Sequence, residues 1–133
     1  MKALVTGAAG FVGRHLVDHL TAEGDDVATT DRSEGGADLL DADGLDREIA
    51  NTAPEVIYHL AGQADVASSW ADAAGTLRTN AEGTLNVLDS ARRHKVRRVV
   101  TVSSADLYGI VIPDDLPVSE DAPLRPVSPY GAS

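Results

Sequence analysis

The sequence predicts an α/β protein built on a Rossmann-type, doubly wound parallel sheet with helices on both faces. Short, continuously apolar runs alternate with amphipathic stretches from the first residue onward, which is the pattern of buried parallel strands separated by helices. A glycine-rich segment, residues 7–13, separates the first apolar run from the first amphipathic stretch. Because consecutive parallel strands are joined by right-handed crossovers, this alternation gives the doubly wound arrangement.

Four segments are predicted to be strands because they are apolar runs with turn-forming or polar residues at their ends. In chain order they are Lys2–Thr6, Asp26–Thr30, Val56–Ala61 and Val96–Ser103. Pro54 precedes the third of them and ends whatever element comes before it.

Three segments with apolar residues at helical spacing are predicted to be helices. They are Phe11–Glu23, Leu45–Thr52 and Ala71–Arg93, the last interrupted by Gly75 and Gly83. From Ile110 onward, five of the six prolines fall within seventeen residues, which predicts a structured loop.

Length and composition narrow the class of protein. The chain has 133 residues, the size of one ordinary domain, and 43% hydrophobic with 24% charged residues is the mix of a soluble globular protein. No apolar run approaches the roughly 20 residues that a membrane helix needs, and no signal peptide is apparent, so we expect no membrane partner. The absence of cysteine excludes disulfides and thiolate sites and is typical of a cytoplasmic protein.

The charge balance argues against nucleic acid as a partner. Eleven Lys and Arg stand against 21 Asp and Glu, a net charge of −10, whereas nucleic-acid affinity comes mainly from basic residues that neutralise phosphates. The one basic cluster, residues 92–98, follows a predicted helix, where cations complement the helix dipole. His15 and His19 are spaced to chelate a metal, but ordinary surface or core roles are favoured and no metal site is predicted.

The glycine-rich segment has the position of a phosphate-binding loop. A dinucleotide pyrophosphate must approach the backbone N–H groups at a helix N-terminus, and side chains there would block it. The third glycine lets the helix lie close to the strand. The alternative is a tight turn without a ligand. The residues predicted to contact the cofactor here are Gly7, Gly10, Phe11, Val12 and Gly13.

An acidic residue at the end of the second strand points to the choice of cofactor. A carboxylate at Asp31 would accept hydrogen bonds from the adenosine ribose hydroxyls and repel a 2′-phosphate, which favours NAD over NADP. Arg32 weakens this preference because an arginine there can hold a phosphate. The alternative for Asp31 is a turn residue at the end of its strand.

With these motifs the chain resembles the extended short-chain dehydrogenases/reductases, the NAD-dependent sugar-nucleotide epimerases and dehydratases. The resemblance runs over the whole chain and keeps the motifs in order. They are the glycine segment 7–13, Asp38-Leu39, His59-Leu60-Ala61-Gly62, Asn80-Ala81-Glu82-Gly83-Thr84, Ser103-Ser104-Ala105-Asp106-Leu107-Tyr108-Gly109 and Pro126-Val127-Ser128-Pro129-Tyr130-Gly131.

The resemblance implies further cofactor residues. Asp38 would hydrogen-bond the adenine amino group beside the Leu39 backbone, and Asn80 would support the active site through its backbone at the bend of the long helix. The residues that would line the cofactor at the end of the third strand are Leu60, Ala61 and Gly62.

It also implies the catalytic groups. Ser104 would orient the sugar oxygen, and Tyr130 would take and return its proton, because hydride transfer from an alcohol leaves a proton to be removed. The alternatives are a strand-capping hydroxyl for Ser104 and an aromatic residue packed beside Pro129 for Tyr130. Asp106 stands where the dehydratases carry a glutamate, one methylene longer.

The residues after the third strand, Gln63-Ala64-Asp65-Val66 and Ser69-Trp70, resemble the branch of 4,6-dehydratases and 4-keto reductases that act on GDP- and dTDP-sugars. We therefore expect a nucleotide-sugar substrate and an epimerase, dehydratase or reductase reaction. Family members commonly dimerise through the long helix, which implies a homodimer.

In the family, a lysine four residues after the tyrosine lowers its pKa, and this would be position 134. We expect residues 1–133 to be the N-terminal portion of an NAD-binding domain, ending before the last strands and the substrate domain and inactive alone. The alternative is a non-catalytic dinucleotide-binding module. The last strand is expected to present an open sheet edge.

Overall fold

The computed structural model describes residues 1–133 as two compact units. The first, called the sheet unit, comprises residues 1–62 and 82–102. The second unit comprises residues 63–81 and 103–133. All buried hydrophobic residues belong to the sheet unit, whereas the buried residues of the second unit are Ser69 and Thr76. The assignment of residues 1–133 to a single dinucleotide-binding domain stays a prediction.

The sheet unit contains the four predicted strands in one parallel sheet of order β2-β1-β3-β4. They are β1 (Lys2–Thr6), β2 (Asp26–Thr30), β3 (Val56–His59) and β4 (Arg98–Thr101). The first two have the predicted bounds. β3 ends two residues before the predicted Ala61, because β1 turns away after Thr6 and the Ala61 N–H bonds to the Thr6 hydroxyl instead, at 3.2 Å. β4 is shorter than predicted because it pairs only with β3.

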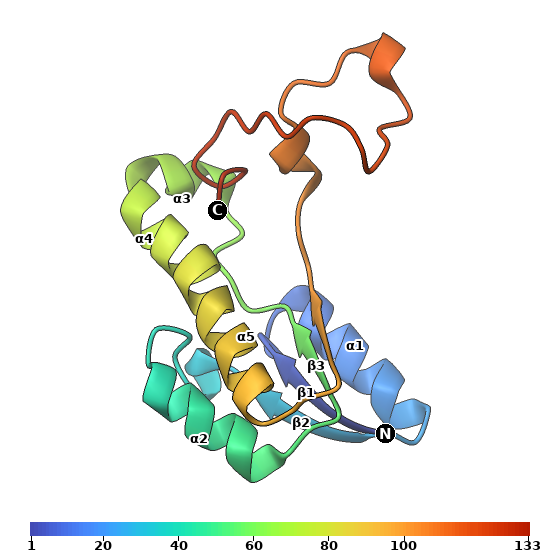
Figure 1. The fold of residues 1–133 in the computed structure, drawn as a ribbon, viewed down its shortest axis with the longest axis vertical. Coiled ribbons are helices and arrows are strands. Elements are labelled where there is room, and N and C mark those ends of the chain that lie inside the picture. Colours follow the sequence, from blue (N-terminus) through green and yellow to red (C-terminus); the bar gives the residue numbers. More distant parts are fainter. The chain divides into compact units, whose positions relative to one another are not determined.

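Helices cover both faces of this sheet, as predicted (Figure 1). Alternate residues of the strands point to opposite faces. One face, with Leu4 and Ile57 in register, packs against α2 (Ala42–Thr52) and α5 (Gly83–Arg93). The other face packs against α1 (Phe11–Ala22) and contains Ala3, Val5, Ala8, Leu20 and Val56.

The bounds of α2 reflect a cap that the apolar spacing did not reveal. The helix begins three residues before the predicted Leu45, because the Asp41 carboxylate accepts a hydrogen bond from the Gly44 N–H at 3.0 Å. Its C-cap, Ala53, has a φ of 46°, the left-handed conformation that commonly ends a helix. No helix of the structure is both long enough and apolar enough to span a bilayer.

The helix predicted over 71–93 begins two residues later than expected and contains a π-helical turn. It consists of α4 (Ala73–Leu77), the π-helical turn (Arg78–Glu82) and α5, which follow one another without a break. Asp72 sets the start, because its carboxylate caps α4 by accepting the Gly75 N–H at 2.9 Å. A short helix that was not predicted, α3 (Val66–Ala71), precedes Asp72.

The proline-rich segment is a structured loop, as predicted. It contains a short 3-10 helix at Pro113–Asp115 and no strand, and a further 3-10 helix, Ala105–Tyr108, precedes it. The Arg125 N–H donates to the Leu107 carbonyl at 3.0 Å, so the loop folds back on its own beginning. Gly109 has a φ of 73°, and a side chain there would collide with the Arg125 carbonyl oxygen.

β4 forms an open edge of the sheet, which confirms the sequence expectation. Val100 lies in register with Tyr58, whose side chain packs on the face covered by α1. Val100 and Val102 nevertheless remain 39% and 61% exposed, because α1 packs against β1 and β2 and leaves this end of the sheet uncovered. An apolar strand edge of this kind can pair with another chain.

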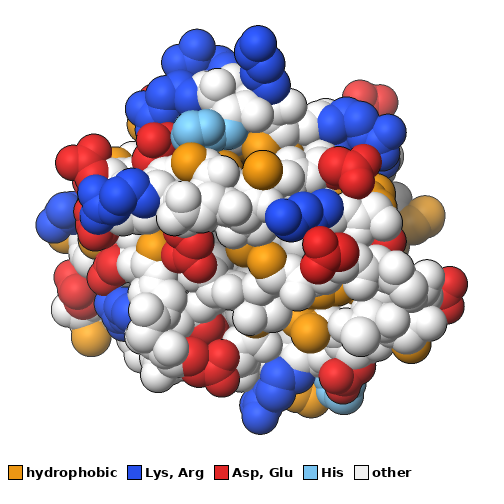
Figure 2. Space-filling model, turned by 90° about the horizontal axis from the view of Figure 1, so that it is seen from below, with side chains coloured by type: hydrophobic (Ala, Val, Ile, Leu, Met, Phe, Trp, Pro, Cys, Tyr) orange, Lys and Arg blue, Asp and Glu red, His pale blue; other side chains and the backbone are white.

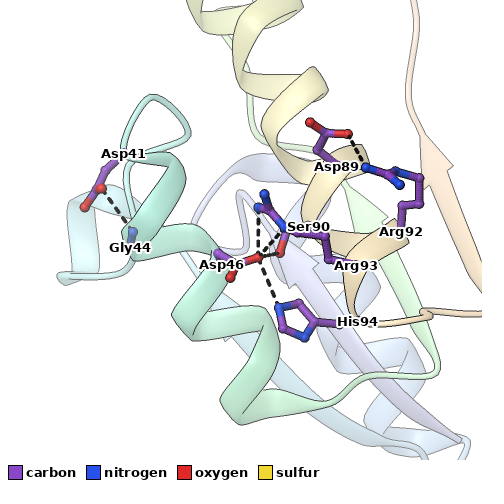
Figure 3. A network of polar contacts seen from close by, with 8 residues as sticks. All are labelled: Asp41, Gly44, Asp46, Asp89, Ser90, Arg92, Arg93 and His94. Atoms are coloured by element: carbon purple, nitrogen blue, oxygen red, sulfur yellow. Dashed lines mark hydrogen bonds and ion pairs between the residues drawn. The ribbon is translucent and has the colours of Figure 1, made fainter.

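A single carboxylate fastens α2 to α5 (Figure 3). Asp46 accepts hydrogen bonds from the Ser90 hydroxyl at 2.7 Å, from Arg93 Nε at 3.1 Å and from His94 Nε2 at 3.0 Å. The Ser90 hydroxyl is the largest cause of the lowered pKa of Asp46, followed by His94 and Arg93.

These contacts also account for part of the basic cluster at residues 92–98. Arg93 and His94 are paired with Asp46, and Arg92 lies 3.6 Å from Asp89. Figure 2 shows basic and acidic side chains interspersed over the face seen from below. These three residues of the cluster therefore make contacts within the fold, at the C-terminal end of α5.

We predict that Asp46→Ala lowers the melting temperature at pH 7, because three donors on α5 and its C-terminus lose their shared acceptor. The pKa of Asp46 lies below its ordinary value of 3.8. The carboxylate therefore makes its full contribution to folding stability above pH 3.8, and this contribution is lost as the pH falls below 3.8. Thermal unfolding at pH 7 and pH 3 checks this. Asp89→Ala, which removes only an exposed pair, should leave the melting temperature unchanged. Equal effects of the two substitutions would contradict the assignment.

Candidate functional site

The turn after β1 depends on two glycines for reasons internal to the fold. Gly7 has a φ of 71°, and a Cβ there would lie 2.7 Å from the Ala61 nitrogen. A Cβ at Gly13 would collide with the Gly7 carbonyl oxygen, so the third glycine brings the helix against the strand as predicted. The Gly7 N–H donates to the Thr30 carbonyl at 2.9 Å and ties the turn to β2.

Gly10 differs from the other two glycines because it leaves the N-terminus of α1 open. It is the exposed N-cap residue, no side chain caps the helix, and the first turn carries no acidic residue. A Cβ there would approach only the Gly7 oxygen, at 3.1 Å. The amides of Phe11, Val12 and Gly13 have no acceptor within the helix. This donor set fits an anionic group such as a pyrophosphate.

Asp31 lies beside this turn and is held as a carboxylate. One oxygen accepts from the Ala9 N–H at 3.2 Å, and the other accepts from the Ser33 hydroxyl and N–H at 2.6 and 2.9 Å. These hydrogen bonds, the Ser33 hydroxyl first, hold the pKa of Asp31 below its ordinary value. The residue caps the 3-10 turn Arg32–Glu34, which is the turn role given above as its alternative, and its ribose role stays a prediction.

Two residues that sequence analysis treated separately form an ion pair. Arg32 Nη1 lies 3.4 Å from an oxygen of Asp38, and both side chains are exposed. The Leu40 N–H is the main cause of the lowered pKa of Asp38, with Arg32 second. Leu39 beside it is buried, and its carbonyl accepts a hydrogen bond from the Asn86 amide at 2.8 Å. One nitrogen of the Arg32 guanidinium is thereby paired with a carboxylate of this chain.

A buried histidine that sequence analysis did not assign to the site braces the end of β3. His59 is 3% exposed, with Nδ1 2.8 Å from the Thr6 hydroxyl and Nε2 3.0 Å from the Thr84 hydroxyl. Burial lowers its pKa. Together with Thr6, His59 fixes the start of the predicted cofactor-lining segment, Leu60–Gly62. A histidine inside an apolar run was the available signal in the sequence.

The second unit brings the predicted catalytic residues into two adjoining turns. The Ser104 hydroxyl accepts a hydrogen bond from the Asp106 N–H at 3.2 Å and so caps the 3-10 helix that follows. Asp106 itself is exposed. A Cβ at Gly131 would lie 2.8 Å from the Asp106 carbonyl oxygen, so the turn that contains Tyr130 lies directly against the Ser104 turn.

Tyr130 is half-buried in a turn stabilised by serine hydroxyls. The Gly131 N–H donates to the Ser128 hydroxyl at 2.9 Å, and the Tyr130 N–H donates to the Ser69 hydroxyl at 3.2 Å. Asn80 lies in the π-helical turn, where sequence analysis expected a bend. Its side chain, rather than its backbone alone, holds this region together, with hydrogen bonds to the Gln63 N–H and carbonyl and to the Ser133 hydroxyl.

The candidate residues thus fall into two groups. The predicted dinucleotide-binding residues, Asn80 excepted, lie in the sheet unit, and the predicted catalytic residues lie in the second unit. No group of three or more His, Asp or Glu side chains is placed to hold a metal ion.

Known proteins resemble this chain along its whole length. The sequence model of the NAD dependent epimerase/dehydratase family matches residues 3–133. A UDP-glucose 4-epimerase of Mycolicibacterium smegmatis is 40% identical over 99% of this chain. A GDP-6-deoxy-D-mannose reductase of Pseudomonas aeruginosa is 36% identical over 99%. The structure of the Thermus thermophilus UDP-glucose 4-epimerase in complex with NAD superposes with a TM-score of 0.90 at 35% identity, over 99% of this chain.

This chain spans less than half the length of those proteins. It covers 47% of the Mycolicibacterium epimerase, 43% of the Pseudomonas reductase and 47% of the Thermus chain. The shared fold and the order of the motifs are therefore those of one part of a longer architecture.

We predict that burial of His59 makes stability pH-dependent near neutrality. Its pKa is depressed from 6.5 in the folded state, so the unfolded chain binds the proton first and stability declines as the pH falls below that value. The slope should approach about 1.4 kcal/mol per pH unit at most. Urea unfolding between pH 7.5 and 5 measures it. His59→Gln should be less stable than the wild type at pH 7, but its free energy of unfolding should depend less on pH between about 7.5 and 5. An unchanged slope in the variant would contradict the prediction.

Proposed function

This chain belongs to the NAD-dependent epimerase/dehydratase family, and on that premise we propose that its protein transfers a hydride between NAD and a carbon of a nucleotide sugar. One observation carries the proposal. An uncapped helix N-terminus beside an ionised Asp31 occurs in the same chain as adjoining turns that contain Ser104 and Tyr130. The first arrangement suits a dinucleotide, and the second suits proton transfer at an alcohol.

The sheet unit would hold the cofactor. The first-turn amides of α1 would face the pyrophosphate, Asp31 would accept from the ribose hydroxyls, and Asp38 would accept from the adenine amino group. The segment Leu60–Gly62 would line the cofactor at the end of β3, and Asn80 would support the site from the π-helical turn. When bound, NAD supplies the hydride acceptor or donor. We favour NAD over NADP because Asp31 is ionised and Arg32 is paired with Asp38.

Tyr130 would act as the acid and base. Its phenol oxygen takes the proton of the sugar hydroxyl as the carbon is oxidised and returns it on reduction, while the Ser104 hydroxyl orients that oxygen. A tyrosine is deprotonated near neutral pH only beside a cation, which the family resemblance places at position 134. Asp106, next to Ser104 and exposed, is the candidate acid for an elimination step.

The proposed substrate class rests on the relatives of this chain. The relatives named above are an epimerase of UDP-glucose and a reductase of a GDP-sugar. We therefore propose a nucleotide sugar, and GDP-, dTDP- and UDP-sugars are the compounds to assay. We also propose a homodimer that uses the outer face of α5, where Leu85 and Leu88 are 58% and 44% exposed.

We predict that Tyr130→Phe lowers turnover at least about 100-fold, because the hydroxyl that exchanges the proton is removed. NAD affinity should not change, since the proposed cofactor residues, Asn80 excepted, lie in the sheet unit. Steady-state assays with the three nucleotide sugars and titration with NAD measure both quantities. Tyr58→Phe removes the same hydroxyl from β3 and should keep full activity. Full activity in Tyr130→Phe would refute the catalytic assignment, and NAD binding without turnover in the wild-type protein would identify a binding module.

We predict that Asp31→Asn weakens NAD binding about tenfold, or about 1.4 kcal/mol, because a charged acceptor becomes neutral. NADP binding should fall less, since the repulsion of its 2′-phosphate is relieved. Fluorescence titrations with the two cofactors give the ratio. Glu34→Gln, in the same 3-10 turn and exposed, is the matched control and should leave the ratio unchanged. An unchanged ratio in Asp31→Asn would contradict the ribose assignment.

A further inference from the structure

The main chain of Tyr130 is held at both of its polar groups by serine hydroxyls. Its N–H donates to Ser69 Oγ at 3.2 Å, and its carbonyl oxygen accepts from Ser133 Oγ at 2.8 Å. Ser133 is three residues away in the same turn, whereas Ser69 is 61 residues earlier in the chain, in α3. The contact with Ser69 therefore joins the tyrosine turn to a separate element of the second unit.

The Ser69 hydroxyl is placed to accept the hydrogen bond from the Tyr130 N–H. Its side chain is fully buried, and its hydroxyl hydrogen is committed to the Val66 carbonyl at 2.7 Å. A hydroxyl has one donor and two acceptor sites, so the remaining lone pair is available to the Tyr130 N–H. Since α3 is also anchored at its start by the Asp65 cap, the acceptor has a defined place.

The hydrogen bond at the Tyr130 carbonyl also leads back to the segment of the chain that contains Ser69. The Ser133 hydroxyl accepts from Asn80 Nδ2 at 2.8 Å, and Asn80 is tied to the backbone of Gln63 through its N–H at 2.7 Å and its carbonyl at 3.0 Å. The segment 63–81 thus fixes the tyrosine peptide from two sides. Because the second unit has no buried hydrophobic residue, these hydrogen bonds carry its internal order.

We propose that Ser69 is a positioning residue, whose hydroxyl sets the place of Tyr130 for proton transfer. The inference rests on the proposed role of Tyr130 and adds a residue that acts through it. Catalytic groups that are slightly misplaced lose much of their rate advantage, so a tyrosine backbone freed from one of its anchors reacts more slowly while substrate binding is largely kept.

The test is Ser69→Ala in the full-length protein, with Ser68→Ala as the matched control. Ser68 lies on the same helix, and its exposed hydroxyl bonds to the Asp65 carboxylate and not to Tyr130. Ser69→Ala should lower kcat about tenfold with KM and the NAD dissociation constant within twofold of wild type, and amide exchange of the Tyr130 peptide should accelerate. Ser68→Ala should change none of these.

The double variant separates this inference from the proposed function. If Ser69 acts through Tyr130, Ser69→Ala should add no further loss in a Tyr130→Phe background, because the effects of residues that act as one unit are not additive. Unchanged kcat and amide exchange in Ser69→Ala, or an additive loss in the double variant, would overturn the role of Ser69. Full activity of Tyr130→Phe would instead refute the proposed function itself.

Discussion

The close approach of Gly7 to the peptide between Leu60 and Ala61 is the contact on which the sheet unit depends. It lets the chain leave the sheet after Thr6, in register with His59 at the end of β3, and it directs the chain into α1. The Thr6 hydroxyl then serves two partners, the Ala61 N–H and His59. The open helix N-terminus and the position of Asp31 both follow from this one turn, because Ala9 and Thr30 are its neighbours.

The two units obtain their order from different forces. In the sheet unit, alternate strand residues fill two apolar clusters, so the positions of the cofactor residues are set by strand register. In the second unit the only buried residues are the hydroxyl-bearing Ser69 and Thr76, and side chain–backbone hydrogen bonds define the turns. Such bonds contribute little net free energy each, but they specify geometry closely. The residues proposed to bind the cofactor and those proposed to be catalytic are therefore held in place by different kinds of interaction.

The hydrophobic pattern of the sequence predicted those elements whose positions depend on the burial of apolar side chains. The strands β1 and β2 and the helices on both faces follow from the alternation of apolar runs with amphipathic stretches. Its failures share a cause, since side chains that bond to the backbone decide them: Asp41 starts α2 three residues early, and Asp72 starts α4 two residues after the predicted Ala71. The same holds for the site. Glycine spacing located the turn, whereas the ion pair of Arg32 with Asp38 and the bond from Tyr130 to Ser69 join residues that no periodicity relates.

The absence of an apolar core around the tyrosine turn has a thermal consequence. Segments with little buried hydrocarbon open locally at free energies well below that of global unfolding. Warming would then disorder the tyrosine turn of residues 1–133 while the sheet and its helices stay folded, and cooling would restore it without any refolding of the core. Within these residues, order at Tyr130 is therefore lost at a lower temperature than order in the sheet.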